Sequence, residues 1–242
     1  MRAVVAAFAF LTRLPVWRGP LRDADLGRSV SFFPLVGLVL GLALTGLAAA
    51  LANTVASPLI AVLLATLLAA LTGGLHLDGF ADVFDALAGG RGDRARTLEI
   101  MRDSRIGAQG AAALILLLIA KVATLAQVAD RHDLLALLAF PTVARWLAAL
   151  LIVLFPYVRA EGLGRAFSGA AGRVQAAVAT GITVVVVAVL GPPLILPALG
   201  TAAGVLAFAF WLHRRLGGLT GDVYGAAVEL AEVLMLLLSC MR

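Results

Sequence analysis

Three aspartates stand at helical spacing in the segment Gly73–Asp85. Asp78, Asp82 and Asp85 are four and three residues apart, so a helix would place their carboxylates on one stripe. No lysine or arginine lies in the segment to neutralise this stripe, and like charges at this spacing repel one another. Hard carboxylate oxygens suit Mg²⁺, Mn²⁺ or Ca²⁺, and Mg²⁺ usually shares its coordination shell with phosphate. The stripe predicts a divalent-metal site, and a solvated acidic face is the alternative.

The surroundings of the stripe favour the metal site. Asp82 and Asp85 fall among apolar residues of a very hydrophobic chain, where carboxylates are usually functional. We expect Asp78 and Asp82 to be metal ligands, with Asp82 also in a catalytic role. Asp85 is either a third ligand or the base that accepts a hydroxyl proton. His76 could add a ligand or contact the substrate, and a capping role fits it equally well.

A basic segment follows the acidic stripe. It holds five arginines in fifteen residues: Arg91, Arg94, Arg96, Arg102 and Arg105. The planar guanidinium donates two parallel hydrogen bonds to phosphate, so the segment predicts an anion-binding surface. We expect Arg102 and Arg105 to bind a substrate phosphate, with Asp103 and Ser104 in the same substrate-binding set. For the first three arginines, membrane topology and anionic lipid head groups explain the charge equally well.

Further ionisable residues stand near the end of the chain and inside apolar runs. Asp222 and Glu229 are seven residues apart, two helical turns on one face, and we expect them to form the second wall of the metal site. The alternative is a helix-capping Asp222 and a Glu229 paired with Lys121 or Arg145. Arg145 is either such a partner or a substrate contact at the floor of a cavity. Glu232 is expected to be structural.

The composition indicates what must position these residues. Of the 242 residues, 62% are hydrophobic and 14% are charged, against about 45–50% and about 25% in an ordinary soluble domain. These values exclude a soluble globular enzyme and a disordered chain, and the one cysteine, Cys240, excludes a disulfide scaffold. We predict a single all-α domain over residues 1–242, a polytopic integral membrane bundle. The apolar runs predict seven spans, at about 31–52, 56–73, 106–128, 134–156, 174–191, 193–212 and 223–241.

Two features qualify the number and direction of the spans. The fifth and sixth predicted spans, 174–191 and 193–212, meet at Gly191–Pro193. If these two spans are instead one kinked or re-entrant element, the number of spans is six. Fifteen of the basic residues, Arg18 among them, fall on one side of the predicted spans, and only Arg131 and Arg242 fall on the other. This asymmetry places the N-terminus and the polar machinery in the cytoplasm. It also explains the basic balance without nucleic acid as a partner.

The motifs resemble a known family. Gly74–Asp82, with Asp85 after it, and Glu99–Gly107 closely resemble cobalamin synthases, also called adenosylcobinamide-GDP ribazoletransferases or cobalamin-5′-phosphate synthases. Phe10–Val16 is similar to the opening of that family and Gly218–Leu230 to its closing motif, and Phe33–Gly37 is a weaker match.

The resemblance implies a reaction, a cofactor and a location. A hydroxyl of α-ribazole or its 5′-phosphate attacks adenosylcobinamide-GDP, giving adenosylcobalamin or its 5′-phosphate and GMP. The family uses Mg²⁺ and lies in the bacterial cytoplasmic (inner) membrane. The implied partners are therefore these small-molecule substrates and the lipid bilayer.

Two alternatives stay open. Gly74, Asp78 and Asp82 fit the second half of the signature of CDP-alcohol phosphotransferases, Gly-x₃-Asp-x₃-Asp, but the first half of that signature does not precede Gly74. Such an enzyme would make a lipid. A transporter would place polar residues near the bilayer centre of several spans and commonly shows internal repeats. Here the acids gather at the cytoplasmic rim instead.

Overall fold

The computed structural model describes residues 1–17, 19 and 21–241. Within these residues the secondary structure is helical apart from one isolated bridge between Tyr157 and Leu219, and no strand is formed. The all-α prediction is confirmed. Arg18 and Arg242, which entered the comparison of charges, lie outside the described residues.

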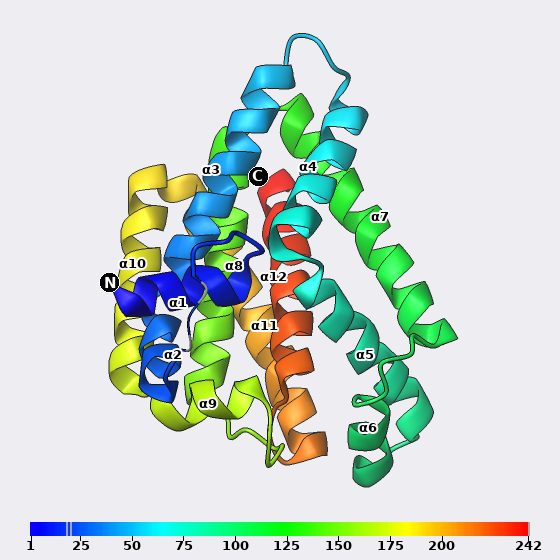
Figure 1. Cartoon of the computed structure of the whole chain (residues 1–242). Helices are drawn as coiled ribbons and strands as arrows, with labels where there is room; N and C mark the ends of the chain where they lie inside the picture. The colour runs from blue at the N-terminus through cyan, green and yellow to red at the C-terminus, as the bar shows by residue number, and fades with distance from the viewer. Residues whose placement is uncertain (18, 20, 242) are drawn as a thin grey trace.

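Six helical segments are long and apolar enough to cross a membrane (Figure 1). The first, Asp23–Leu51, joins α2 (Asp23–Ser29) through a short 3₁₀ turn to α3 (Phe33–Leu51). The others are α7 (Ala108–Asp130), α8 (Leu134–Leu154), α10 (Arg173–Leu190), Pro192–Leu216, which contains α11 (Ile195–Leu216), and α12 (Gly221–Cys240). Each coincides with one of the seven predicted spans.

The remaining predicted span is part of a bent pair of helices. α4 (Ser57–Thr72) and α5 (Leu75–Gly90) meet at 92°. The bend forms at Gly73 and Gly74, whose φ angles of 65° and 71° are left-handed values that glycine adopts without steric cost. The spans therefore number six, or seven if this pair counts as one. The re-entrant element considered at Gly191–Pro193 does not form, because that turn separates two helices that are each long enough to span the membrane. The bent pair lies at α4 and α5 instead.

Helices α8 and α12 form the centre of the bundle. In their most apolar stretches 72% and 67% of the residues are buried, against 22% in α7 and 17% in α10. The side chains that α7 and α10 leave exposed are largely apolar, as expected for helices that face lipid. Two short helices, α6 (Arg94–Ile100) and α9 (Leu163–Ala170), lie at the end of the bundle where α12 begins (Figure 1).

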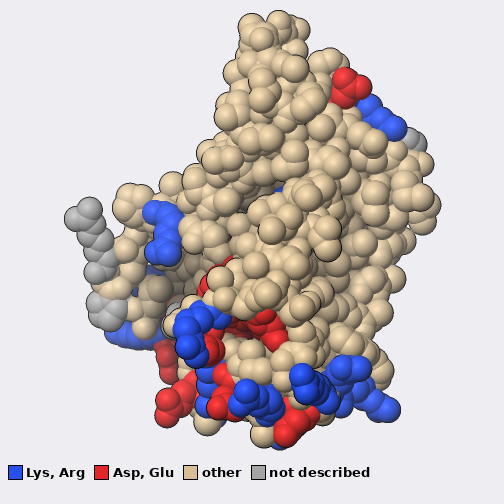
Figure 2. Space-filling view, turned by 90° about the vertical axis from the view of Figure 1, so that its right-hand side faces the viewer, with Lys and Arg blue, Asp and Glu red and all other residues tan. Residues whose placement is uncertain are grey.

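Charged side chains gather at this same end of the molecule. In Figure 2 the lower end carries most of the basic and acidic groups of the face in view, and the surface above it is almost uncharged. The acidic stripe on α5 and the arginines on and around α6 belong to this end.

Candidate active site

The acidic stripe of α5 packs against the first turns of α12. Gly79 makes this possible, because a methyl group at its Cα would lie 2.8 Å from the carbonyl oxygen of Asp222. The close approach brings Asp222 to the stripe: the charged neighbours of Asp82 are Asp78, Asp222, Arg159 and Asp85. Segments separated by some 140 residues thus supply one carboxylate cluster, which we call the acid cluster: Asp78, Asp82 and Asp222.

The packing of α5 on α12 yields a first testable expectation. Gly79→Ala forces the two backbones apart and should destabilise the protein by about 1–3 kcal/mol, the usual cost of overpacking. Gly46→Ala is the matched control, because that position in α3 faces open space. The thermal unfolding midpoint in detergent should fall for Gly79→Ala alone. Equal midpoints for the two variants would contradict the close packing.

Arg159 is a site residue that the sequence analysis missed. It follows the end of α8, and its guanidinium forms an ion pair with the carboxylate of Asp222. It also donates a hydrogen bond of 3.0 Å to the carbonyl of Met101, while its Nε is buried without a partner. In the sequence Arg159 is one of fifteen basic residues on the same side, and nothing in its neighbours singles it out.

Asp85 is engaged with the backbone of another helix. Its two carboxylate oxygens accept hydrogen bonds of 2.7 Å from the N–H groups of Gly107 and Gly110, in the first turn of α7. Gly107 has no side chain to cap that helix, so Asp85 caps it from α5. A metal-ligand or base role for Asp85 stays a prediction, while the geometry shows a residue that holds α5 and α7 together.

The loop between α6 and α7 lies beside the acid cluster, fixed at both ends. Met101 is tied to Arg159 and Gly107 to Asp85. Its polar side chains point outward: Arg105 forms an exposed ion pair with Asp103 at 2.6 Å, which lowers the pKa of Asp103 to about 2. The side chains of Arg102 and Ser104 are exposed on the same loop. A substrate-binding role for these four residues stays a prediction, and the structure places them on an exposed loop.

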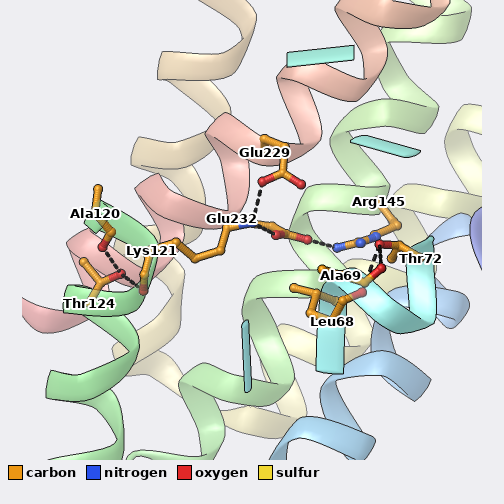
Figure 3. A network of polar contacts seen from close by, with 9 residues as sticks. All are labelled: Leu68, Ala69, Thr72, Ala120, Lys121, Thr124, Arg145, Glu229 and Glu232. Atoms are coloured by element: carbon orange, nitrogen blue, oxygen red, sulfur yellow. Dashed lines mark hydrogen bonds and ion pairs between the residues drawn. The ribbon is translucent and has the colours of Figure 1, made fainter. Parts of the chain in front are cut away.

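Glu229 and Arg145 lie in a separate buried network (Figure 3). Lys121 pairs with Glu229 and, at 2.6 Å, with Glu232, which also pairs with Arg145. The network joins α7, α8 and α12, and its four side chains are at most 6% exposed. Glu229 is not among the charged neighbours of Asp82. The network matches the structural alternative that the sequence left open, and a metal-ligand role for Glu229 or a substrate contact for Arg145 stays a prediction.

Two hollows adjoin the acidic residues. A cavity of about 230 Å³ is lined by Asp78, Asp222 and Arg159, with His76 also in its wall. An open groove of about 670 Å³ is lined by Asp85 together with Arg91 and Arg96.

The donor atoms of the cluster suit Mg²⁺. In the described part of the chain, no three histidine, cysteine, aspartate or glutamate side chains converge as a complete metal cage. Mg²⁺ rarely requires one, because it is commonly held by one or two carboxylates together with substrate phosphates. Asp78 and Asp82 supply such oxygens one helical turn apart, and Asp222 faces them from α12.

The fold and this cluster define a polytopic helical membrane protein with a carboxylate site bordered by arginines. The sequence model of the cobalamin-5-phosphate synthase family matches residues 3–240, and the chain belongs to that family. Relatives named adenosylcobinamide-GDP ribazoletransferase occur in Geotalea daltonii (45% identical, covering 98% of this chain and 96% of the relative) and Citrobacter koseri (42%, covering 96% of each). A further relative of that name, in Klebsiella pneumoniae, is 41% identical over 98% of each chain. No solved structure matches the chain. The family resemblance seen in the motifs is confirmed, and the lipid-forming alternative is not favoured.

Proposed function

We propose that this protein is an adenosylcobinamide-GDP ribazoletransferase, which joins adenosylcobinamide-GDP to α-ribazole or α-ribazole 5′-phosphate. The observation that carries this conclusion is the family match over residues 3–240. The acid cluster with Arg159 agrees with it, because the donor carries a diphosphate whose negative charge a carboxylate-bound metal ion and an arginine can neutralise. The products are adenosylcobalamin, or its 5′-phosphate, and GMP.

The reaction displaces a nucleotide from a pyrophosphate. The acceptor hydroxyl oxygen forms a bond to the phosphorus on the cobinamide side, and the bond from that phosphorus to the bridging oxygen breaks. GMP leaves with the bridging oxygen, and the hydroxyl proton passes to a carboxylate of the site. Arg159 lies where its guanidinium can neutralise charge that develops on the phosphoryl oxygens.

Magnesium would be held by Asp78 and Asp82 together with the substrate diphosphate. When bound, it neutralises the negative charge of the diphosphate and orients the attacked phosphorus. The nucleotide end of the donor would bind in the groove beside Arg91, next to the exposed polar side chains of the loop 101–107. The groove has a volume of about 670 Å³, and its arginines can donate hydrogen bonds to phosphate. The corrin ring, being large, stays outside the small cavity.

We further propose that the protein lies in the bacterial cytoplasmic (inner) membrane with the site facing the cytoplasm. Support comes from the asymmetry of the basic residues, which favours the cytoplasm for the arginine-rich side. The charged end of the molecule in Figure 2 is the end at which α12 begins in Figure 1, and Asp222 of the acid cluster stands in the first turn of α12.

The direct test is product analysis. Purified protein is incubated with Mg²⁺, adenosylcobinamide-GDP and α-ribazole, and in parallel with a CDP-linked lipid donor and an alcohol. One GMP should appear for each corrinoid joined to the nucleoside, and no CMP should form. CMP release without GMP release would overturn the proposal in favour of a CDP-alcohol phosphotransferase.

Arg159 provides a prediction for the same assay. Arg159→Lys keeps a positive charge and loses the forked guanidinium, so kcat should fall by about 10²-fold, as for loss of one oriented donor in a transition state. Arg165→Lys, on the exposed surface of α9, is the matched control and should keep full activity. Equal activity of the two variants would remove Arg159 from the site.

A further inference from the structure

The cavity of about 230 Å³ beside the acid cluster contains polar atoms that nothing in the described structure satisfies. His76 is 4% exposed and Tyr224 is 7% exposed, and both line the cavity. Neither the Nδ1 atom of His76 nor the hydroxyl of Tyr224 has a hydrogen-bond partner. Buried polar atoms are nearly always paired, so two unpaired polar side chains in the lining of one cavity point to a ligand that bonds to at least one of them.

The walls of this cavity are aromatic. Phe167 packs on Phe10 and Phe33, with ring centroids 4.4 and 5.8 Å apart. Tyr157 and Tyr224 also line the cavity, with their ring centroids 6.4 Å apart and their planes at 30°. Three phenylalanines and two tyrosines thus enclose a space that favours a flat aromatic ring.

The lining of the cavity combines charged and apolar groups. Asp78, Asp222 and Arg159 contribute the charged groups, and the phenylalanines together with Ala148 contribute apolar surface. A ligand that suits this lining has a flat apolar ring, a hydroxyl to present to the acid cluster, and a nitrogen or oxygen acceptor. Drug-sized ligands occupy pockets of about 300–1,000 Å³, so a corrin ring does not fit here, whereas a small nucleoside base does.

We infer that this cavity is the subsite for the acceptor nucleoside, an inference that rests on the proposed function. The base of α-ribazole, a dimethylbenzimidazole, lies between the phenylalanine cluster and the tyrosine pair. The hydroxyl of Tyr224 donates a hydrogen bond to the free ring nitrogen of the base. The ribose then extends toward Asp78 and Asp222, where its hydroxyl meets the donor diphosphate. Ala148 limits the size of the base.

The test measures binding of α-ribazole to the purified full-length protein by equilibrium titration, and KM for each substrate in the GMP-release assay. Tyr224→Phe removes the donor and keeps the ring, so Kd for α-ribazole should rise about 2–10-fold with an unchanged KM for adenosylcobinamide-GDP. Phe167→Leu should also raise Kd, whereas Phe208→Leu, in α11 outside this cavity, is the matched control.

A size exchange distinguishes a subsite from a structural role. Ala148→Leu narrows the cavity that Ala148 lines and should disfavour α-ribazole by about 10-fold or more relative to the nucleoside of unsubstituted benzimidazole, since one carbon group in an apolar pocket has effects of that order. A merely structural role would weaken both nucleosides equally.

The possible outcomes separate this inference from the proposed function. Wild-type protein that releases GMP with α-ribazole, combined with variants that change Kd for α-ribazole or the preference between bases, supports the subsite. The subsite alone is overturned if the wild type is active but Tyr224→Phe and Ala148→Leu leave binding of α-ribazole unchanged. The same conclusion follows if these variants raise KM for both substrates equally. A wild-type protein that neither binds α-ribazole nor releases GMP overturns both.

Discussion

Asp82→Asn should abolish transfer while leaving the protein folded in the membrane. Asp82 stands within the electrostatic reach of Asp78, Asp222 and Asp85, with Arg159 as the nearby cation. Asparagine keeps the size of the side chain and removes the charge that holds a divalent ion and its diphosphate. Removing one preorganised group that stabilises charge in the transition state typically lowers kcat by about 10²–10³-fold. Removing a metal ligand is expected to lower kcat at least as much. The measurement is GMP release at saturating substrates and Mg²⁺.

Stability supplies the control for this variant. Removing one of several repelling carboxylates relieves like-charge repulsion, so the thermal unfolding midpoint of Asp82→Asn should equal that of the wild type or exceed it. Asp23→Asn, an exposed acid at the start of α2, should change neither activity nor unfolding. Full activity of Asp82→Asn would remove the metal-site argument, whatever its stability.

Glu232→Ala should destabilise the protein more than any surface substitution. Glu232 bridges Lys121 and Arg145, and Arg145 has no exposed side-chain surface and two further nitrogens without partners. Removing the glutamate leaves a buried guanidinium without its anion, and breaking a buried ion pair in this way costs about 3–5 kcal/mol. The measurement is the free energy of unfolding in mixed detergent micelles.

Two further variants test whether charge is the cause. Glu99→Gln breaks an exposed ion pair with Arg96 and should cost at most about 1 kcal/mol. The double variant Glu232→Leu with Arg145→Met removes both charges and keeps apolar volume, so it should recover much of the loss. A Glu232→Ala protein as stable as Glu99→Gln would show that the network does not stabilise the bundle.

Much of the fold could be predicted from the sequence, because lipid imposes a simple demand on it. Each span must satisfy its own backbone hydrogen bonds, so long apolar runs become helices regardless of detail. The bend between α4 and α5 was not predicted, since it depends on Gly73 and Gly74 taking left-handed angles where the apolar run of α4 ends. Glycine pairs of this kind occur in many helices and turns, and the sequence does not say which conformation they take.

The site was partly predictable for a related reason. Asp78 and Asp82 belong to one helix, where spacing alone places them together, and Asp222 was expected from its motif. Arg159 and the capping role of Asp85 depend on which helix ends meet in space. The same holds for Glu229, whose spacing from Asp222 suggested the metal site, whereas Lys121 on α7 lies close enough to pair with it.

The most direct measurement is Mn²⁺ binding by electron paramagnetic resonance, with Mn²⁺ in place of Mg²⁺ and adenosylcobinamide-GDP present. If Asp78 and Asp82 hold the divalent ion together with the donor diphosphate, the wild type binds Mn²⁺ and each of Asp78→Asn and Asp82→Asn weakens binding by at least about 10-fold, while Asp23→Asn does not. Unchanged Mn²⁺ affinity in Asp78→Asn and Asp82→Asn would contradict the assignment of the metal to the acid cluster.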